Sequence, residues 1–555
     1  MRMWTDAVGT AKTPLVGGDA RFGWNHLGPW VFYLMAIPYR LLGRSAVGLL
    51  VGAAIINVIC FVFILRCVRS LAGQRAALVL AAGILTFLLT ASGNRLIDPW
   101  NPYVVQLPFL LAVVSCWAVL NRRWQWLPWL VGAGSLCVQG HIAFLAPVVA
   151  LFIATAWSIV RAPRIDTRTA LRRSGIVAVI AWLPAVIDLF MPSGHNLFRV
   201  ARFFVEPSPA PTGGLSAGVN VLLRETGLGS SWLGGHLGLR LFTEGFDGGL
   251  GPLPGAGLVF LVVAGVIARR RHDAVLGSLV MILVVLLPVA VAEMAVGRGE
   301  LYPYLFGWVT LVGMMCWVAG LLAILPLRDS LLLTPGLMVA VLVVALSLVA
   351  TGLTADLPRS PRERPQDAGI VRQLVAEARP GLRRGTDYQL DHGSDAFSSI
   401  YEMGVVDSLR RDGYHIMVEP RGQVLFGRHM IDPRACTYPT ISVVAPFESI
   451  NPGDRLLALS DPLSPRERAH EADLVAALAT TYQQQGSPSA ADIVRFAEGD
   501  LVVIANAIHP DPLLQPELQQ LASLRSRGRS IAIVLHDATP GPLDQCEHTL
   551  NLRQP

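Results

Sequence analysis

Apolar and polar positions alternate in long blocks over the first two thirds of the chain. Apolar runs close to the length of a bilayer span, about 20 residues, occur at 45–68, 74–92, 103–120, 125–140, 142–161, 172–192, 252–269, 273–296, 303–325 and 329–353. This pattern predicts about ten transmembrane helices, and hence a polytopic α-helical membrane protein.

The pattern changes after residue 354. Short β-type runs at 414–418, 441–445, 501–505 and 530–535 alternate with helical stretches near 366–379, 464–485 and 513–526. Such alternation is typical of a small α/β domain. The predicted organisation is an N-terminal segment (1–44), a transmembrane domain (45–354), a Pro- and Arg-rich linker (355–365) and an α/β domain (366–555).

The N-terminal segment places a polar cluster directly before an apolar run. In Phe22–Gly43 the residues Asn25 and His26 precede a stretch that contains Pro29 and Pro38. This stretch is too short and too interrupted to span a bilayer. We predict an interfacial or re-entrant helix that leads into the first span.

The distribution of arginine among the loops predicts which side of the membrane each loop occupies. Alternate connections carry Arg66–Arg75, Arg122–Arg123, Arg161–Arg173, Arg269–Arg271 and Arg328. Basic loops stay in the cytoplasm. The remaining connections, the N-terminal segment and the α/β domain are therefore predicted to be extracytoplasmic, in a protein of the plasma membrane.

Composition agrees with a membrane protein: 53% of residues are hydrophobic, 15% are charged and the mean hydropathy is +0.50. No soluble segment interleaves basic residues with stacking aromatics, so a nucleic-acid partner is not expected. The seven cysteines show no Cys-x-x-Cys spacing. Cys436 and Cys546 lie in the α/β domain and are either a disulfide or two buried free thiols.

Polar side chains that could carry chemistry gather on the predicted outer face, whereas the cytoplasmic loops offer Arg and little else. They are Asp6, Asp19, Asn25, His26, Arg95, Asp98, Asn101, Gln139, His141, Asp188, Asn196, Arg199, Arg202, Glu293, Arg298 and Tyr302. Ionisable groups at span ends are costly and mark functional sites. Turn formation, interhelical hydrogen bonds and contacts with lipid phosphates are the alternative explanations.

Several of these motifs occur in a recognisable order. They are Thr13–Gly17, Phe22–Trp30, Asp98–Pro102, Gln139–His141 and Trp182–Asp188, followed by Gly194–Asn196. The ordered set resembles the GT-C superfamily of polyprenyl-phosphate-sugar-dependent glycosyltransferases, in particular its protein-mannosyltransferase-like and actinobacterial arabinosyltransferase-like members. The resemblance implies an enzyme that moves a hexose or pentose from a polyprenyl-phosphate donor to an envelope glycan, lipid or protein acceptor on the outer face.

The absence of nucleotide-binding motifs agrees with such a donor, because the chain has no Walker A run, no Gly-x-Gly-x-x-Gly and no Asp-x-Asp. The resemblance implies an Asp base in the first external loop. Asp98, Asp6 and Asp19 are the candidates, with Arg95, His141, Arg199, Arg202 and Arg298 as phosphate-facing groups and the other polar residues above as substrate contacts. No cofactor is implied, and the need for a divalent cation stays open. The rival interpretation is an inactive envelope scaffold or a transporter of lipid-linked glycans.

The sequence departs from the resembling family at its start. Family members have a first span before the external loop, whereas this sequence begins inside the loop. We expect the genomic sequence upstream of Met1 to stay open in frame and to encode about 20 apolar residues, the length of one span. Sequencing that region tests the expectation, and an in-frame stop directly before Met1 would favour a shortened paralogue instead.

Overall fold

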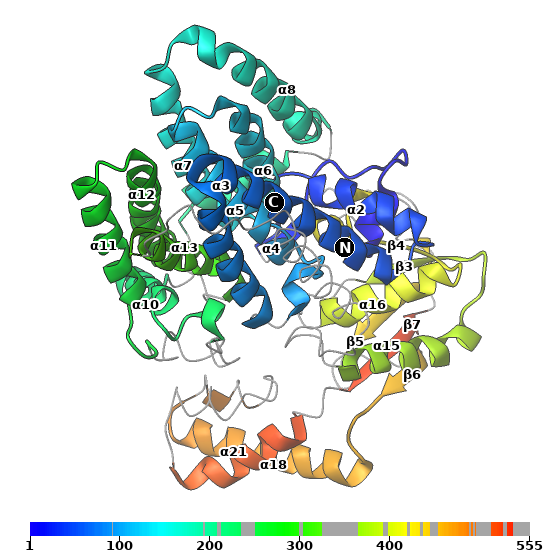
Figure 1. Cartoon of the computed structure of the whole chain (residues 1–555). Helices are drawn as coiled ribbons and strands as arrows, with labels where there is room; N and C mark the ends of the chain where they lie inside the picture. Colours follow the sequence, from blue (N-terminus) through cyan, green and yellow to red (C-terminus); the bar gives the residue numbers. More distant parts are fainter. Residues whose placement is uncertain are drawn as a thin grey trace. The chain divides into compact units, whose positions relative to one another are not determined.

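The computed structural model describes residues 1–20, 22–90, 93–191, 195–207, 212–234, 250–298, 303–324, 365–391, 398–418, 422–432, 437–444, 453–487, 490–491, 494, 512–525 and 530–536. Internal contacts divide the chain into two units, Met1–Leu357 and Pro358–Pro555. Figure 1 shows the helices of the first unit and the strands and helices of the second.

The first unit is a bundle of helices preceded by a short β-hairpin. Its helices are α1 (Arg2–Ala7), α2 (Trp30–Leu41), α3 (Ala46–Thr90), α4 (Asn101–Val104), α5 (Gln106–Leu120), α6 (Leu127–Gly140), α7 (Leu145–Val160), α8 (Arg164–Leu189), α9 (Asn196–Val205), α10 (Gly214–Thr226), α11 (Ala256–Arg270), α12 (Ala274–Val296) and α13 (Gly307–Ile324). The hairpin strands are β1 (Asp19–Ala20) and β2 (Trp24–Asn25). Every apolar run predicted to span falls on a helix, except 329–353, which lies outside the described residues.

Within the described residues, six helices are long and apolar enough to cross a membrane. This confirms the prediction of a multi-pass helical membrane protein. One of the six, α3, contains most of two predicted spans, 45–68 and 74–92. They meet at Gly73, which interrupts the helical geometry with a φ of 89°. Only glycine adopts that conformation without strain. Helices α6 and α11 have 14 and 15 residues and are shorter than a full span.

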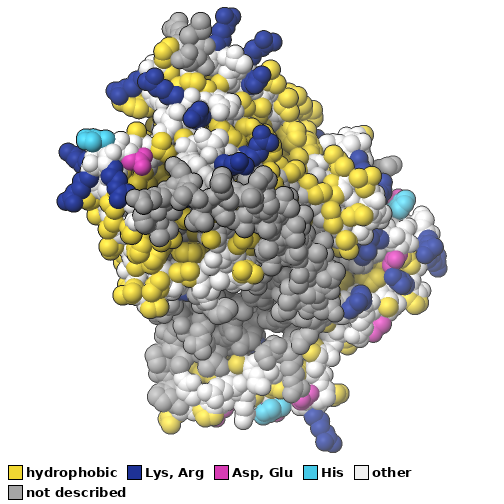
Figure 2. Space-filling model, in the orientation of Figure 1, with side chains coloured by type: hydrophobic (Ala, Val, Ile, Leu, Met, Phe, Trp, Pro, Cys, Tyr) yellow, Lys and Arg dark blue, Asp and Glu magenta, His cyan; other side chains and the backbone are white. Residues whose placement is uncertain are grey.

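Burial divides central helices from peripheral ones. The apolar window of α4 and α5 together (Asn101–Leu120) is 89% buried. That of α8 is 17% buried, so most of its apolar surface faces outward. In Figure 2 apolar side chains cover much of the helical unit, and Lys and Arg side chains gather near α8 and beside α11 and α12. Exposed apolar side chains on the helices, with cations at some of the helix ends, are expected of a protein that sits in a bilayer.

The second unit contains a mixed five-stranded sheet. Its strands are β3 (Asp387–Asp391), β4 (His415–Val418), β5 (Thr440–Val444), β6 (Arg455–Ser460) and β7 (Ile531–His536), in the order β4-β3-β5-β7-β6. Its helices are α15 (Pro365–Ala378), α16 (Ser398–Arg411), α17 (Gln423–Phe426), α18 (Pro465–Gln484) and α21 (Gln515–Arg525). Strand β3 is parallel to β4 and β5, and β7 is antiparallel to both neighbours.

The α/β character predicted for this unit is confirmed. Strands β4, β5 and β7 and helices α15, α18 and α21 match predicted segments, while β3, β6 and α16 are additional elements. The predicted strand at 501–505 and both cysteines, Cys436 and Cys546, lie outside the described residues.

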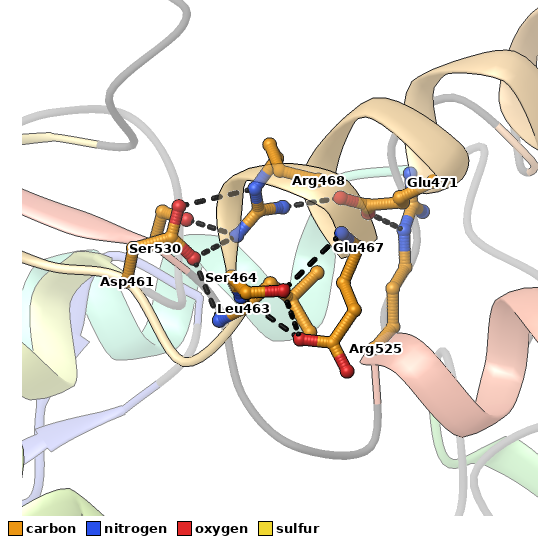
Figure 3. A network of polar contacts seen from close by, with 8 residues as sticks. All are labelled: Asp461, Leu463, Ser464, Glu467, Arg468, Glu471, Arg525 and Ser530. Atoms are coloured by element: carbon orange, nitrogen blue, oxygen red, sulfur yellow. Dashed lines mark hydrogen bonds and ion pairs between the residues drawn. The ribbon is translucent and has the colours of Figure 1, made fainter.

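A polar network centred on Arg468 ties α18 to the sheet and to α21 (Figure 3). The Arg468 guanidinium bonds Asp461 after β6, Ser530 before β7 and Glu471 one turn further along α18. Glu471 in turn accepts a hydrogen bond from Arg525 of α21, with an Nε–Oε1 distance of 2.7 Å. Burial opposes ionisation of Asp461, but the hydrogen bonds from Arg468 and from the Leu463 N–H lower its pKa overall.

We predict that Arg468→Met weakens this unit, because Asp461 and Glu471 then lose their shared cation in a partly buried site. The expected cost is about 2–4 kcal/mol. Amide hydrogen exchange of the full chain in detergent should show faster exchange in β6 and β7. Arg466→Met, at an exposed position of the same helix, is the matched control.

The same network predicts that the stability of the second unit depends on acid pH. Because the folded pKa of Asp461 lies below its ordinary value of 3.8, its contribution to stability is complete above that value and is lost as the pH falls through the lower folded pKa. Equal exchange in the two Arg variants would contradict a stabilising role for the network.

Candidate active site at the predicted outer ends of the helices

The site begins with a hairpin formed by residues 17–28. The Gly17 N–H donates to the His26 carbonyl at 2.8 Å, and the His26 N–H donates to the Gly18 carbonyl at 2.9 Å. Strands β1 and β2 extend this ladder, and Gly23 turns the chain with a φ of 79°. Small residues are needed here, since a Cβ at Gly17 would lie 2.8 Å from the His26 Cβ. The polar cluster of the N-terminal segment is thus held in a defined backbone shape.

The hairpin packs on Gln139 of α6. A Cβ at Gly28 would lie 2.0 Å from the Gln139 Oε1, so the hairpin backbone packs directly on this buried amide. The Gln139 Nε2 donates to the Ala181 carbonyl of α8 at 2.7 Å, and the Trp30 indole donates to the same carbonyl at 2.8 Å. The hairpin, α2, α6 and α8 therefore meet at one point.

Asn25 and Asn196 join the hairpin to the start of α9. The Asn25 N–H donates to the Asn196 Oδ1 at 2.9 Å, and the Asn196 Nδ2 donates back to the Asn25 carbonyl at 2.7 Å. The Asp188 carboxylate at the end of α8 accepts the Asn196 N–H at 3.1 Å. All three side chains are buried, so they form a satisfied polar junction.

Two histidines lie against each other beside this junction. The rings of His26 and His141 are 4.7 Å apart between centroids. The Nδ1 atom of each accepts a backbone N–H, from Ile142 and Ala143 respectively, at 3.3 Å. Each neutral ring therefore carries its proton on Nε2, as assigned from these hydrogen bonds. Burial lowers the pKa of His26 to about 3, so that ring is a neutral N–H donor at physiological pH.

The segment from Arg95 to Tyr103 borders the histidines. The Asp98 carboxylate accepts the Trp100 N–H at 2.8 Å, and the Asn101 Nδ2 donates to the Gly140 carbonyl at 2.8 Å. Tyr304 packs against both Trp100 and His141, with centroid distances of 4.9 and 5.7 Å. This segment is therefore attached directly to the turn that carries His141.

Asp98 differs from an ordinary surface carboxylate. Burial raises its pKa, and the Trp100 N–H and the nearby Arg95 cation only partly offset that effect. Arg95 itself lies 5.2 Å above the Tyr103 ring. A carboxylate with a raised proton affinity next to a cation suits proton transfer.

Arg298 closes the far side of the site. Its guanidinium donates to the carbonyls of Phe203 and Glu206 at the end of α9 and lies 4.8 Å from the Phe203 ring. Phe203 also packs against Phe22 and Trp24 of the hairpin, at 4.6 and 5.6 Å. Helix α9 is therefore held at its start by Asn25 and Asp188 and at its end by Arg298 and the hairpin aromatics.

The other candidate residues lie at several positions, and one of them, Asp19, pairs with Asn25 across the hairpin. Asp6 lies 3.5 Å from the Arg44 guanidinium and its side chain is 44% exposed. Asp19 is exposed on β1, Arg199 is exposed on α9, and Arg202 on α9 pairs with Glu206. Glu293 lies beside the Trp308 indole, and Tyr302 lies outside the described residues.

A narrow pocket of about 50 Å³ opens next to Asp188 and Asn196. The other lining residues are apolar: Val16, Leu27, Trp182, Ala185, Val186, Leu189 and Leu197. Within the described residues, no group of three or more His, Cys, Asp or Glu side chains could hold a metal ion. The chemistry that the cluster supports is hydrogen bonding and proton transfer next to an apolar surface.

Sequence reasoning missed several residues that shape the site. Tyr304 and Phe203 line it through aromatic contacts, and Gly17 and Gly28 permit the hairpin to dock. The available signal was the glycine pattern of residues 17–28, which indicates tight turns and close backbone approach.

Comparisons with known proteins add two similar structures. Neither a family model nor a curated protein sequence matches the chain. The crystal structure of ArnT from Cupriavidus metallidurans in the apo state is 12% identical, with a TM-score of 0.47, over 80% of this chain and 87% of that one. The same protein bound to undecaprenyl phosphate is 13% identical, with a TM-score of 0.49, over 82% and 90%. Because both TM-scores lie below 0.5, we draw no conclusion from these similarities.

We predict that Gly28→Ala destabilises the helical unit by about 1–3 kcal/mol, because the added methyl group overlaps the Gln139 amide. Gly175→Ala on α8 is the matched control, since a Cβ there meets nothing within 4 Å. Thermal unfolding in detergent measures both. Gly28→Ala combined with Gln139→Ala should recover part of the loss, and a strictly additive double variant would contradict the direct contact.

Proposed function

We propose that this protein is an integral membrane glycosyltransferase that takes a sugar from a polyprenyl-phosphate donor and transfers it to a cell-envelope acceptor. The observation that carries the proposal is Asp98, a partly buried carboxylate with a raised pKa that accepts the Trp100 N–H and lies near the Arg95 cation. The ordered sequence motifs that resemble GT-C enzymes include this residue. The outer face of the plasma membrane is the proposed side of reaction.

Asp98 is the proposed base. Direct transfer of the sugar requires a carboxylate that takes the proton of the acceptor hydroxyl as the bond to the sugar forms. Asp6 and Asp19 fit this role less well, because the first is half exposed beside Arg44 and the second is exposed on the hairpin. Burial gives Asp98 the higher proton affinity that the role demands.

The departing polyprenyl phosphate needs charge stabilisation, and the cluster supplies it. Arg95 is the nearest cation to Asp98, and the Nε2–H groups of His26 and His141 are neutral donors. Fixed donors of this kind stabilise charge that develops in a transition state. Asn101 and Gln139 support these donors, because their amide groups bond the carbonyls of Gly140 and Ala181.

Helix α9 offers a surface for the lipid. Its exposed residues combine Phe198, Phe204 and Val205 with Arg199 and Arg202. Apolar side chains that alternate with arginine suit a polyprenyl chain whose phosphate lies at the membrane surface. We assign Arg199 and Arg202 to donor approach, and Asn25, Asp188, Asn196 and Arg298 to the framework of the binding site.

The test uses full-length protein in nanodiscs with a panel of undecaprenyl-phosphate-linked hexoses and pentoses. Asp98→Asn should lower the transfer rate by about 100-fold or more, while binding of undecaprenyl phosphate persists. Since the base must be ionised, the wild-type rate should fall with acid at a pH above 3.8, the ordinary value for Asp.

Asp6→Asn and Asp19→Asn are the matched controls and should transfer at the wild-type rate. Loss of transfer in either control but not in Asp98→Asn would overturn the assignment of the base. No transfer from any donor by wild-type protein would favour the scaffold or transporter interpretation.

A further inference from the structure

The second unit contains a polar constellation that is unrelated to the membrane site. It consists of Ser442 on β5, His536 at the end of β7 and Asp454 directly before β6. The register pairs Thr440 with His536 and Arg455 with Leu535. Asp454 therefore lies across from His536, and Ser442 lies diagonally from it on the same face of the sheet, because side chains two residues apart share a face.

The distances fit a chain of hydrogen bonds. The Ser442 Oγ lies 2.9 Å from the His536 Nε2, and the His536 Nδ1 lies 2.6 Å from the Asp454 Oδ1. A carboxylate can only accept, so the Nδ1 carries the ring proton and the Nε2 is left as an acceptor for the serine hydroxyl. This is the direction of proton flow that activates a serine nucleophile.

The three residues differ in how far they are exposed to solvent. Ser442 is 3% exposed and the Asp454 side chain 11%, whereas the His536 side chain is 26% exposed. The carboxylate is thus shielded enough to orient the ring, while the imidazole keeps an edge toward solvent. A buried serine hydroxyl needs only one hydrogen bond, and that need alone does not call for an aspartate behind its partner.

We propose that Ser442, His536 and Asp454 form a nucleophile–base–orienter relay that gives this unit a second activity, the cleavage of carboxylic esters. Ser442 Oγ attacks the ester carbonyl carbon, and its proton passes to the His536 Nε2. The carbon–oxygen bond to the alcohol then breaks, and the alcohol leaves with that proton. Water hydrolyses the acyl-serine by the same route, which releases the acid and restores the hydroxyl.

The low exposure of Ser442 restricts the substrate to slender acyl groups, such as the acetyl esters found on many glycans. The proposal does not depend on the glycosyl transfer proposed above, because the three residues lie in the second unit. Asp454 acts through His536 and is a positioning residue, whereas Ser442 and His536 contact the reacting atoms.

The test treats the full-length protein in detergent with a fluorophosphonate probe and locates the adduct by peptide mass spectrometry. We expect a covalent adduct on Ser442 of the wild-type protein and hydrolysis of p-nitrophenyl acetate. His536→Gln should slow labelling by about 100-fold or more, and Asp454→Asn by about 10-fold or more, with a shifted pH profile.

Ser460→Ala is the matched control, since Ser460 is another buried serine of the same sheet and should leave labelling unchanged. Amide hydrogen exchange of β5 and β7 verifies that each variant keeps the sheet. An unlabelled Ser442 in folded wild-type protein would overturn the proposal. Equal labelling of wild type and His536→Gln would overturn the relay.

Discussion

The helical unit depends on close backbone contacts and on polar groups that reach backbone carbonyls. Apolar helices gain little by exchanging lipid for one another, so packing and hydrogen bonds must hold them. A Cβ at Gly313 would lie 2.1 Å from the Glu225 carbonyl, and one at Gly218 would lie 2.4 Å from the Val291 carbonyl. Gln139 and Trp30 both bond the Ala181 carbonyl. The first two contacts hold α10, α12 and α13 together, and the last two join the end of α6 and the start of α2 to α8, where the candidate site is built.

The candidate site combines the buried polar junction with a less buried segment that carries Asp98 and Arg95. Asn25, Asn196 and Asp188 satisfy one another and define geometry. Asp98 and Arg95 are less completely enclosed, and the aromatic contacts of Trp100 and Tyr304 attach their segment to His141.

The spans could be predicted because desolvation imposes long apolar runs, which a sequence shows directly. The hairpin at 17–28 could not, since strands of two residues such as β1 and β2 leave no periodicity. Strand β3 was missed because Asp387, Gln389 and Asp391 make it look like a polar loop. The order of the site motifs was visible in the sequence, but their meeting point depends on tertiary contacts. The Ser442 constellation draws on three strands, of which β7 lies far from the others in the sequence, and follows no motif.

Helix α9 has one further consequence. Asn196 ties its start to Asn25, and the Arg298 contacts with Phe203 and Glu206 tie its end to the segment directly after α12. The exposed face of α9 carries Phe198 and Phe204, which suits the proposed position of this helix among lipid headgroups, where amphipathic helices are sensitive to curvature. Because both ends are fixed, α9 cannot shift without moving the hairpin. We therefore expect the thickness and curvature of the surrounding bilayer to act on the polar junction mechanically.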